Sequence, residues 1–221
     1  MRWLPALLLL ACSAAAHAAE VRVLTLGDSF TIGTGARADQ AFPAVLSSLW
    51  RPACAVTLRN PARNGFTTQD LLDRELGEAA GFDPHLVTLA IGANDIVRGV
   101  SVDAYRTQIG RIFDGLLVAG VPADRVIALP QPAWHRSPVA ASFGDPAALG
   151  ARIDLFNRTL REVATTRGAA WLELGPLMTA QADAGMIAAD GLHPSAEAYA
   201  AWAPAVAAAA SRICPAATKS F

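Results

Sequence analysis

Apolar positions along the chain follow two alternating periods. Short stretches at residues 21–26, 56–60, 86–91, 125–129 and 171–174 have the composition of β-strands, and all but 56–60 are mainly apolar. Between them, apolar residues recur at three- and four-residue spacing, which is typical of helices with one buried face. These helical stretches lie at residues 42–49, 71–76, 105–117, 153–163 and 195–212.

Strands that alternate with helices predict right-handed βαβ units and a parallel sheet covered on both faces. We therefore expect one α/β domain at residues 19–221, with a flavodoxin-like three-layer α/β/α sandwich around five parallel strands. No internal repeat, low-complexity linker or second boundary interrupts the pattern. Ligands of open α/β sheets bind beyond the carboxyl ends of the strands, so the turns after the strands are the first place to look for chemistry.

The first strand ends abruptly in Gly27-Asp28-Ser29-Phe30. Ser29 thus follows a strand's carboxyl end, where backbone N–H groups at the next helix start can meet an anion. Taken alone, this segment fits an ordinary turn with a capping serine equally well. A serine hydroxyl becomes a useful nucleophile only when a base takes its proton, so the rest of the chain has to supply a histidine.

Three histidines follow residue 18. His85 precedes the third strand, which predicts a solvated position at the opposite edge of the sheet. His135 follows the fourth strand on the correct side but has no nearby carboxylate, so it fits the cleft wall better than the base. His193 follows Asp190 by three residues with Gly191 between them, a spacing that can set a carboxylate against Nδ1 and leave Nε2 free.

The segment around His193 also fits a plain turn and helix start. Its combination with Ser29 favours a Ser-His-Asp triad. An acyl-transfer site also needs donors for an oxyanion, and two loops offer them: Gly65 after the second strand by its backbone N–H, and Asn94 after the third by its side-chain amide. Each also fits a structural role, Gly65 as a turn glycine and Asn94 as a helix cap.

In sequence order, Gly27 to Phe30, Asn64-Gly65, Gly92 to Asp95 and Asp190 to His193 resemble the blocks that define the SGNH, or GDSL, family of serine hydrolases. The resemblance implies that Ser29 is the nucleophile, His193 the base and Asp190 its orienting carboxylate. It assigns the oxyanion hole to Ser29, Gly65 and Asn94, and it implies carboxylic ester hydrolysis through an acyl-enzyme without a cofactor.

Three neighbouring residues remain outside these roles. Asp28 and Asp95 are interpreted as carboxylates that brace tight turns. Phe30 stands where the family more often has leucine or isoleucine, a departure that should alter packing under the serine more than the chemistry.

Two other functions deserve comparison. An ordinary α/β-hydrolase requires Gly-x-Ser-x-Gly at a strand-to-helix turn, and the nearest match, residues 140–144, begins with alanine and follows a proline-containing loop. A secreted carbohydrate-binding module on the same scaffold would be favoured by the loss of one block, and all four are present.

Charge and composition limit the classes of partner and cofactor that we expect. The chain has 221 residues, a net charge of -1 and no basic stripe, which gives no reason to expect binding to nucleic acid or to an anionic membrane. No histidine cluster, Cys-x-x-Cys pair or phosphate-binding glycine loop is present, so we expect neither a metal nor a cofactor.

The first 18 residues have the features of a signal peptide: a short basic start, an apolar stretch and Ala16-His17-Ala18 as a cleavage site. Residues 9–12 also resemble a lipoprotein box in which Cys12 carries lipid. We expect a periplasmic or secreted protein, held at a membrane only if Cys12 is lipidated.

Cys54 and Cys214 remain after export as an even pair in an oxidising compartment. Sequence cannot give the distance between them, so a disulfide and two separate buried thiols both remain open.

The only long loop, residues 130–146, combines Trp134 and Phe143 with prolines, His135 and Arg136. Aromatic and cationic groups beside a serine suit a small acyl group on a polar or aromatic alcohol, including carbohydrate O-acetyl esters. We interpret Trp134 and Phe143 as substrate-binding residues. The alternative is a lysophospholipase or thioesterase acting on long acyl chains.

Overall fold

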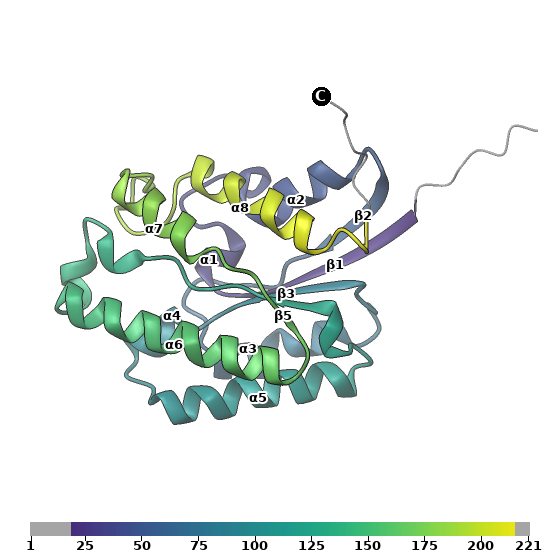
Figure 1. Ribbon diagram of the computed structural model, residues 1–221, viewed down its shortest axis with the longest axis horizontal. Helices are drawn as coiled ribbons and strands as arrows, with labels where there is room; N and C mark the ends of the chain where they lie inside the picture. The colour runs from purple at the N-terminus through teal and green to yellow at the C-terminus, as the bar shows by residue number, and fades with distance from the viewer. Residues whose placement is uncertain (1–18, 215–221) are drawn as a thin grey trace, which may run out of the picture.

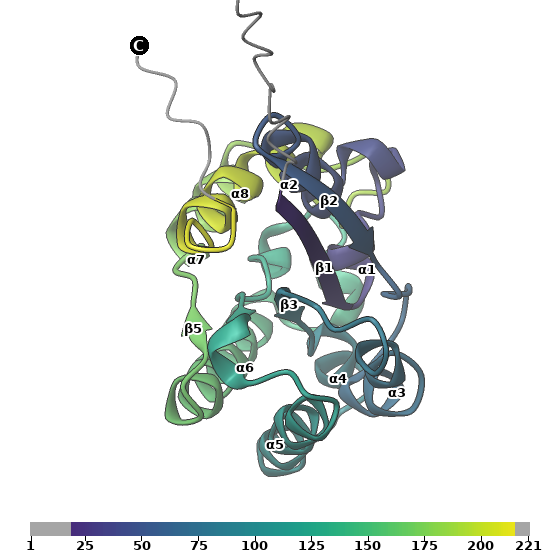
Figure 2. The same cartoon turned by 90° about the vertical axis from the view of Figure 1, so that its right-hand side faces the viewer.

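Five parallel strands form one sheet in the order β2-β1-β3-β4-β5 in a computed structural model that describes residues 19–214 (Figures 1 and 2). This is the flavodoxin-like order, so the fold expected from the sequence is confirmed. The strands are β1 (Ala19–Gly27), β2 (Cys54–Arg59), β3 (Leu86–Ala90), β4 (Val126–Ala128) and β5 (Ala170–Trp171).

Helices cover both faces of the sheet (Figure 1). One layer contains α2 (Phe42–Trp50), α7 (Gly175–Asp183) and α8 (Ala196–Ala209), and the other contains α3 (Thr68–Arg74), α5 (Val102–Val118) and α6 (Pro146–Thr166). Two short helices, α1 (Ser29–Ile32) and α4 (Ala93–Val97), directly follow β1 and β3. The 3-10 turns are η1 (Ala38–Gln40), η2 (Leu76–Ala79), η3 (Ala123–Arg125), η4 (Trp134–Arg136) and η5 (Ala140–Phe143).

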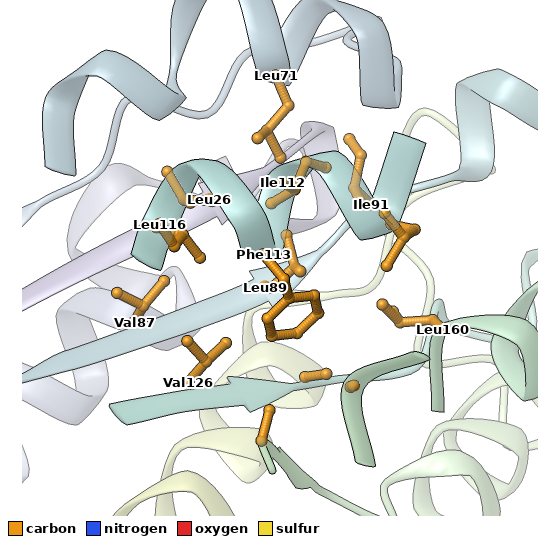
Figure 3. Close-up of a cluster of buried hydrophobic side chains, with 14 of the residues drawn as sticks. Leu26, Leu71, Val87, Leu89, Ile91, Ile112, Phe113, Leu116, Val126 and Leu160 are labelled. Atoms are coloured by element: carbon orange, nitrogen blue, oxygen red, sulfur yellow. The ribbon is translucent and has the colours of Figure 1, made fainter. Parts of the chain in front are cut away.

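The apolar side chains of the strands divide between two buried clusters, one on each face. Leu24 and Leu26 of β1 pack with α3, α5 and α6, whereas Val21 and Val23 pack with α2, α7 and α8. Figure 3 shows the first cluster, in which Phe113 of α5 lies over the sheet. Burial on both faces explains why these strands have apolar residues at nearly every position.

Strand β1 extends further toward its carboxyl end than its neighbour β2 does. Its pairing with β2 ends at Leu24 opposite Arg59, whereas its pairing with β3 continues to Gly27 opposite Ala90. The last residues of β1 therefore have a strand on one side only.

Some elements differ from the sequence expectation. The fifth strand is shorter than residues 171–174, because the chain turns into α7 at Gly175. The short helices α1 and α4 were not predicted, since four or five residues give no helical period.

Cys54 and Cys214 form a disulfide that joins the start of β2 to the segment after α8. This resolves the alternative that the sequence left open. The proposed signal peptide and Cys12 lie outside the described residues. Within residues 19–214, no helix combines the length and the apolar character needed to cross a membrane.

Candidate active site

Ser29 is the first residue of α1, immediately beyond the carboxyl end of β1. Asp28 caps this helix, and its Oδ1 accepts the Phe30 N–H at 3.0 Å. A side chain at Gly27 would place its Cβ 2.2 Å from Thr31 Oγ1 and 2.3 Å from the Ala90 oxygen, so only glycine fits the turn. Ser29 itself is 8% exposed and borders a pocket.

Asp190 and His193 are paired in the loop before α8. Asp190 Oδ2 lies 2.7 Å from His193 Nδ1, and its Oδ1 accepts the backbone N–H groups of Leu192 at 2.9 Å and His193 at 3.0 Å. Burial opposes the charge of Asp190, but these hydrogen bonds outweigh burial and lower its pKa below the ordinary value. The carboxylate stays ionised and orients the imidazole, which leaves Nε2 as the free ring nitrogen.

Two contacts bring His193 beside the turn that carries Ser29. The ring of Phe30 packs against the imidazole with 5.2 Å between centroids. Gly35 lies so close that a Cβ there would be 3.2 Å from His193 Cβ. Segments 158 and 163 residues apart in sequence thus meet at one end of the sheet.

The two expected oxyanion donors lie in different elements, Gly65 in the loop after β2 and Asn94 in the first turn of α4. Gly65 has a φ of +79°, and a Cβ there would meet nothing within 4 Å, so its surroundings are open. Asn94 Nδ2 donates to the Phe66 oxygen at 3.0 Å, which uses one of its two amide hydrogens and leaves the other available. Arg98 Nη2 donates to the Gly65 oxygen at 2.8 Å and so fixes this loop from the end of α4.

Asp95 of α4 stabilises the same region through hydrogen bonds from Thr68. It is fully buried, and it accepts the Thr68 N–H at 3.0 Å and the Thr68 hydroxyl at 2.5 Å. These bonds and the helix cap of Asp28 agree with the interpretation of both carboxylates as loop braces. Burial raises the pKa of Asp95, and it raises the pKa of Asp28 to about 7.

A small apolar pocket of about 50 Å³ opens beside Ser29 and Asn94. Trp134 and Phe143, the two expected substrate-binding residues, lie in its wall in an edge-to-face pair with centroids 5.6 Å apart. The remaining wall residues are Phe30, Ala93, Val97 and Leu192. A larger hollow of about 340 Å³ lies at the amino ends of the strands, beside Glu20 and His85, on the opposite edge from Ser29.

The other two histidines lie elsewhere. His85 is half-buried at the start of β3, where Nδ1 accepts the Arg22 N–H at 3.0 Å, so it is more enclosed than the solvated position we expected. His135 packs against Gly150 of α6 and is not part of the wall of the pocket at Ser29. Burial lowers the pKa of His135.

Sequence reasoning missed Arg98 and Glu75. Arg98 follows Asn94 by four residues, which places both on one face of a helix and was a usable signal. Glu75 at the end of α3 gave none, because a carboxylate at a helix end usually faces solvent. In the structure it is fully buried, and its Oε2 accepts the Gly27 N–H at 2.9 Å. Across residues 19–214, no group of three His, Cys, Asp or Glu side chains is arranged to hold a metal ion.

The chain resembles known proteins in sequence. The profile of the GDSL-like Lipase/Acylhydrolase family matches residues 25–201. Thioesterase 1/protease 1/lysophospholipase L1 of Escherichia coli (strain K12) is 35% identical over 131 residues, which cover 58% of this chain. The match spans 62% of the length of that relative.

Solved structures share the fold at lower sequence identity. LAE5, an alpha/beta hydrolase enzyme from the metagenome of Lake Arreo, Spain, has a TM-score of 0.69 at 23% identity, covering 87% of this chain and 95% of that one. TesA has a TM-score of 0.69 at 22% identity, covering 87% of this chain and 99% of that one. Phospholipase A1 from Streptomyces albidoflavus NA297 has a TM-score of 0.69 at 20% identity, covering 85% and 98%.

Proposed function

Because the chain belongs to the GDSL-like lipase/acylhydrolase family, we propose that it is a secreted serine hydrolase that cleaves short-acyl carboxylic esters through an acyl-enzyme. The observation that carries the proposal is the Asp190–His193 pair at 2.7 Å, whose imidazole packs against Phe30, the residue after Ser29 and a wall residue of a small apolar pocket. Substrates of this kind include esters of small molecules and of carbohydrates.

The first chemical step is attack by Ser29. Its hydroxyl gives the proton to His193 Nε2 as Oγ bonds to the ester carbonyl carbon, and the carbonyl oxygen becomes an oxyanion. Asp190, kept ionised by its hydrogen bonds, stabilises the imidazolium that forms.

The oxyanion is stabilised by the Ser29 N–H, the Gly65 N–H and the second amide hydrogen of Asn94. Donors of this type typically contribute about 2.7 to 4 kcal/mol each. Arg98 and Phe66 hold Gly65 and Asn94 in place before substrate binds, which avoids reorganisation during the reaction.

The first intermediate then collapses: the bond from the carbonyl carbon to the alcohol oxygen breaks, His193 gives its proton to the leaving alcohol, and the acyl group stays on Ser29. In the second half of the reaction His193 takes a proton from water, whose oxygen attacks the acyl-enzyme carbonyl. As this intermediate collapses, the bond between Ser29 Oγ and the acyl carbon breaks, and His193 returns the proton to Oγ, which frees the acid and restores Ser29.

A fluorophosphonate probe tests the assignment directly. We expect a covalent adduct on Ser29, found by peptide mass spectrometry, and we expect Ser29→Ala and His193→Ala to lose nearly all esterase activity while keeping a cooperative thermal transition. Well-folded protein that gives no adduct at Ser29 would instead support a carbohydrate-binding module. Substantial turnover by either variant would remove the triad from consideration.

Long-acyl hydrolysis is the second candidate, because the E. coli relative is a thioesterase and lysophospholipase by name. The small pocket favours the short-acyl proposal, and Val97 and Phe143, 51% and 40% exposed, are where a longer chain would continue over the surface. Measuring kcat/KM for esters of increasing acyl length distinguishes short-acyl from long-acyl hydrolysis.

Export is part of the proposal and rests on residues 1–18 of the sequence. Mass spectrometry of the mature amino terminus should find Ala19 if cleavage follows Ala18, or a lipidated Cys12 in the lipoprotein case. An intact Met1 on protein recovered from its native envelope would refute both.

A further inference from the structure

We infer that Glu75 is a positioning residue for Ser29, whose uncharged carboxyl group holds the backbone of Gly27 at the point where the neighbouring strand has ended. The inference rests on the proposed role of Ser29 as nucleophile and adds a residue that the four sequence blocks do not contain.

The strand register creates the need for such a group. Pairing between β1 and β2 stops at Leu24, so no β2 residue accepts the N–H of Gly27 three positions later. An unpaired backbone N–H in a buried place is costly. The Oε2 atom of Glu75 accepts this N–H at 2.9 Å and takes the place of the missing strand.

The surroundings of Glu75 favour its uncharged form. The residue sits at the end of α3, where its own N–H donates to the Leu71 oxygen at 2.9 Å, and its side chain is fully buried. Among the described residues, its Oε1 has no hydrogen-bond partner. An ionised carboxylate with an unpaired buried oxygen is far more costly than a neutral carboxyl group in the same place.

The charged groups that face Glu75 act in both directions. Asp28, in the turn after β1, and Asp70, on α3, are negative and oppose its ionisation, whereas Arg63, in the loop after β2, favours it. Asp95 in turn raises the pKa of Asp28, after the larger effect of burial. Burial is the largest influence and outweighs the hydrogen bond from Gly27, which favours the ionised form, so the pKa of Glu75 is raised to about 8.

The position of Gly27 controls that of Ser29 two residues later. Gly27 lies between Thr31 and Ala90 on one side and Glu75 on the other, so the strand end has little freedom while the carboxyl group is present. A displacement of about 1 Å at a reacting group can cost about a hundredfold in rate. Ionisation of Glu75 would also add negative charge below a site that has to stabilise an oxyanion.

Three variants separate these effects: Glu75→Gln, Glu75→Leu and, as a matched control, Glu78→Gln on turn η2, where Glu78 is only partly buried and pairs with Arg59 at 3.0 Å. The glutamine at position 75 keeps a carbonyl acceptor for Gly27 but cannot ionise, so we expect kcat/KM within about threefold of wild type at pH 7. We expect kcat/KM of the wild type to decline above about pH 8 as Glu75 ionises, and this decline should be absent from Glu75→Gln and present in the control.

The leucine variant removes the acceptor. We expect kcat and the rate of fluorophosphonate labelling at Ser29 to fall at least tenfold, with KM little changed, because the acyl pocket is untouched. Folded Glu75→Leu protein labelled at the wild-type rate, or a Glu75→Gln profile that keeps the alkaline decline, would overturn the inference. If Glu75→Leu does not fold, the pH profile of kcat/KM for Glu75→Gln tests the inference on its own. Wild-type protein that is never labelled at Ser29 refutes the proposed function instead.

Discussion

The ring of Phe30 lies against the imidazole of His193, with 5.2 Å between their centroids. From the sequence we expected Phe30 to affect packing under Ser29, but the ring also contacts the candidate base. Phe30 is 5% exposed and so is fixed by the core on its other side. One residue thus joins the turn that carries Ser29 to the loop that carries His193.

Replacing Phe30 by leucine keeps an apolar side chain and removes the ring contact. Aromatic pairs of this kind contribute about 0.5 to 1.5 kcal/mol, so kcat should fall about two- to thirteenfold as His193 gains freedom. KM should change as well, because Phe30 also lines the pocket beside Ser29. Steady-state kinetics of Phe30→Leu beside Phe143→Leu, which alters the pocket away from His193, would check this. A change confined to KM in Phe30→Leu would contradict the role in positioning His193.

Glu75 should make the protein less stable as the pH rises. Its ordinary pKa is 4.5, and burial raises the pKa in the folded protein to about 8. Between these values the unfolded chain releases a proton that the folded protein retains, so the free energy of unfolding falls with rising pH by up to about 1.4 kcal/mol per pH unit. Below pH 4.5 the carboxyl group is protonated in both states, so Glu75 adds no pH dependence to the free energy of unfolding.

Thermal unfolding of Glu75→Gln and wild type from pH 5 to 9 measures this contribution. The advantage of the glutamine variant should grow up to about pH 8 and then level off. Asp28, whose pKa burial raises to about 7, titrates in both proteins, so the difference reports Glu75 together with its charge interaction with Asp28. Two melting curves that stay parallel over the whole range would show that Glu75 does not titrate in this window.

Local patterns predicted much of this molecule. Most strands have their own apolar run, and the pairing of Asp190 with His193 needs only three residues of spacing and a glycine. The contact of Glu75 with Gly27 depends on where β2 stops, which no local pattern reports. The contact between Phe30 and His193 likewise depends on tertiary structure, because it forms only when the loop before α8 meets the turn after β1.

The disulfide was open in the sequence for the same reason, since its two cysteines are 160 residues apart. Closing so long a loop restricts the unfolded chain, and bonds of this kind typically stabilise by about 2 to 5 kcal/mol. We expect the double variant Cys54→Ala, Cys214→Ala to show a lower melting temperature in oxidising buffer, while kcat stays near the wild-type value because the bond lies at the opposite edge of the sheet from Ser29. A reducing agent should lower the wild-type melting temperature and leave the variant unchanged. Equal melting temperatures for the two proteins without reductant would contradict a stabilising bond.

The acyl preference follows from the pocket beside Ser29. A space of about 50 Å³, closed by the Trp134–Phe143 pair, accepts a few carbon atoms before the chain has to leave over the exposed Val97. Additional methylenes then gain little burial, whereas each fully buried methylene is worth about 0.8 kcal/mol. We expect kcat/KM in a series with one leaving group to be highest between acetyl and hexanoyl and lower for palmitoyl, since this ratio reports transition-state discrimination. Phe143→Ala opens the wall and should shift the optimum toward longer chains. A wild-type maximum at about twelve carbons or longer would reject the short-acyl proposal and favour the lysophospholipase or thioesterase alternative, because burial would then have to continue along the surface beyond this pocket.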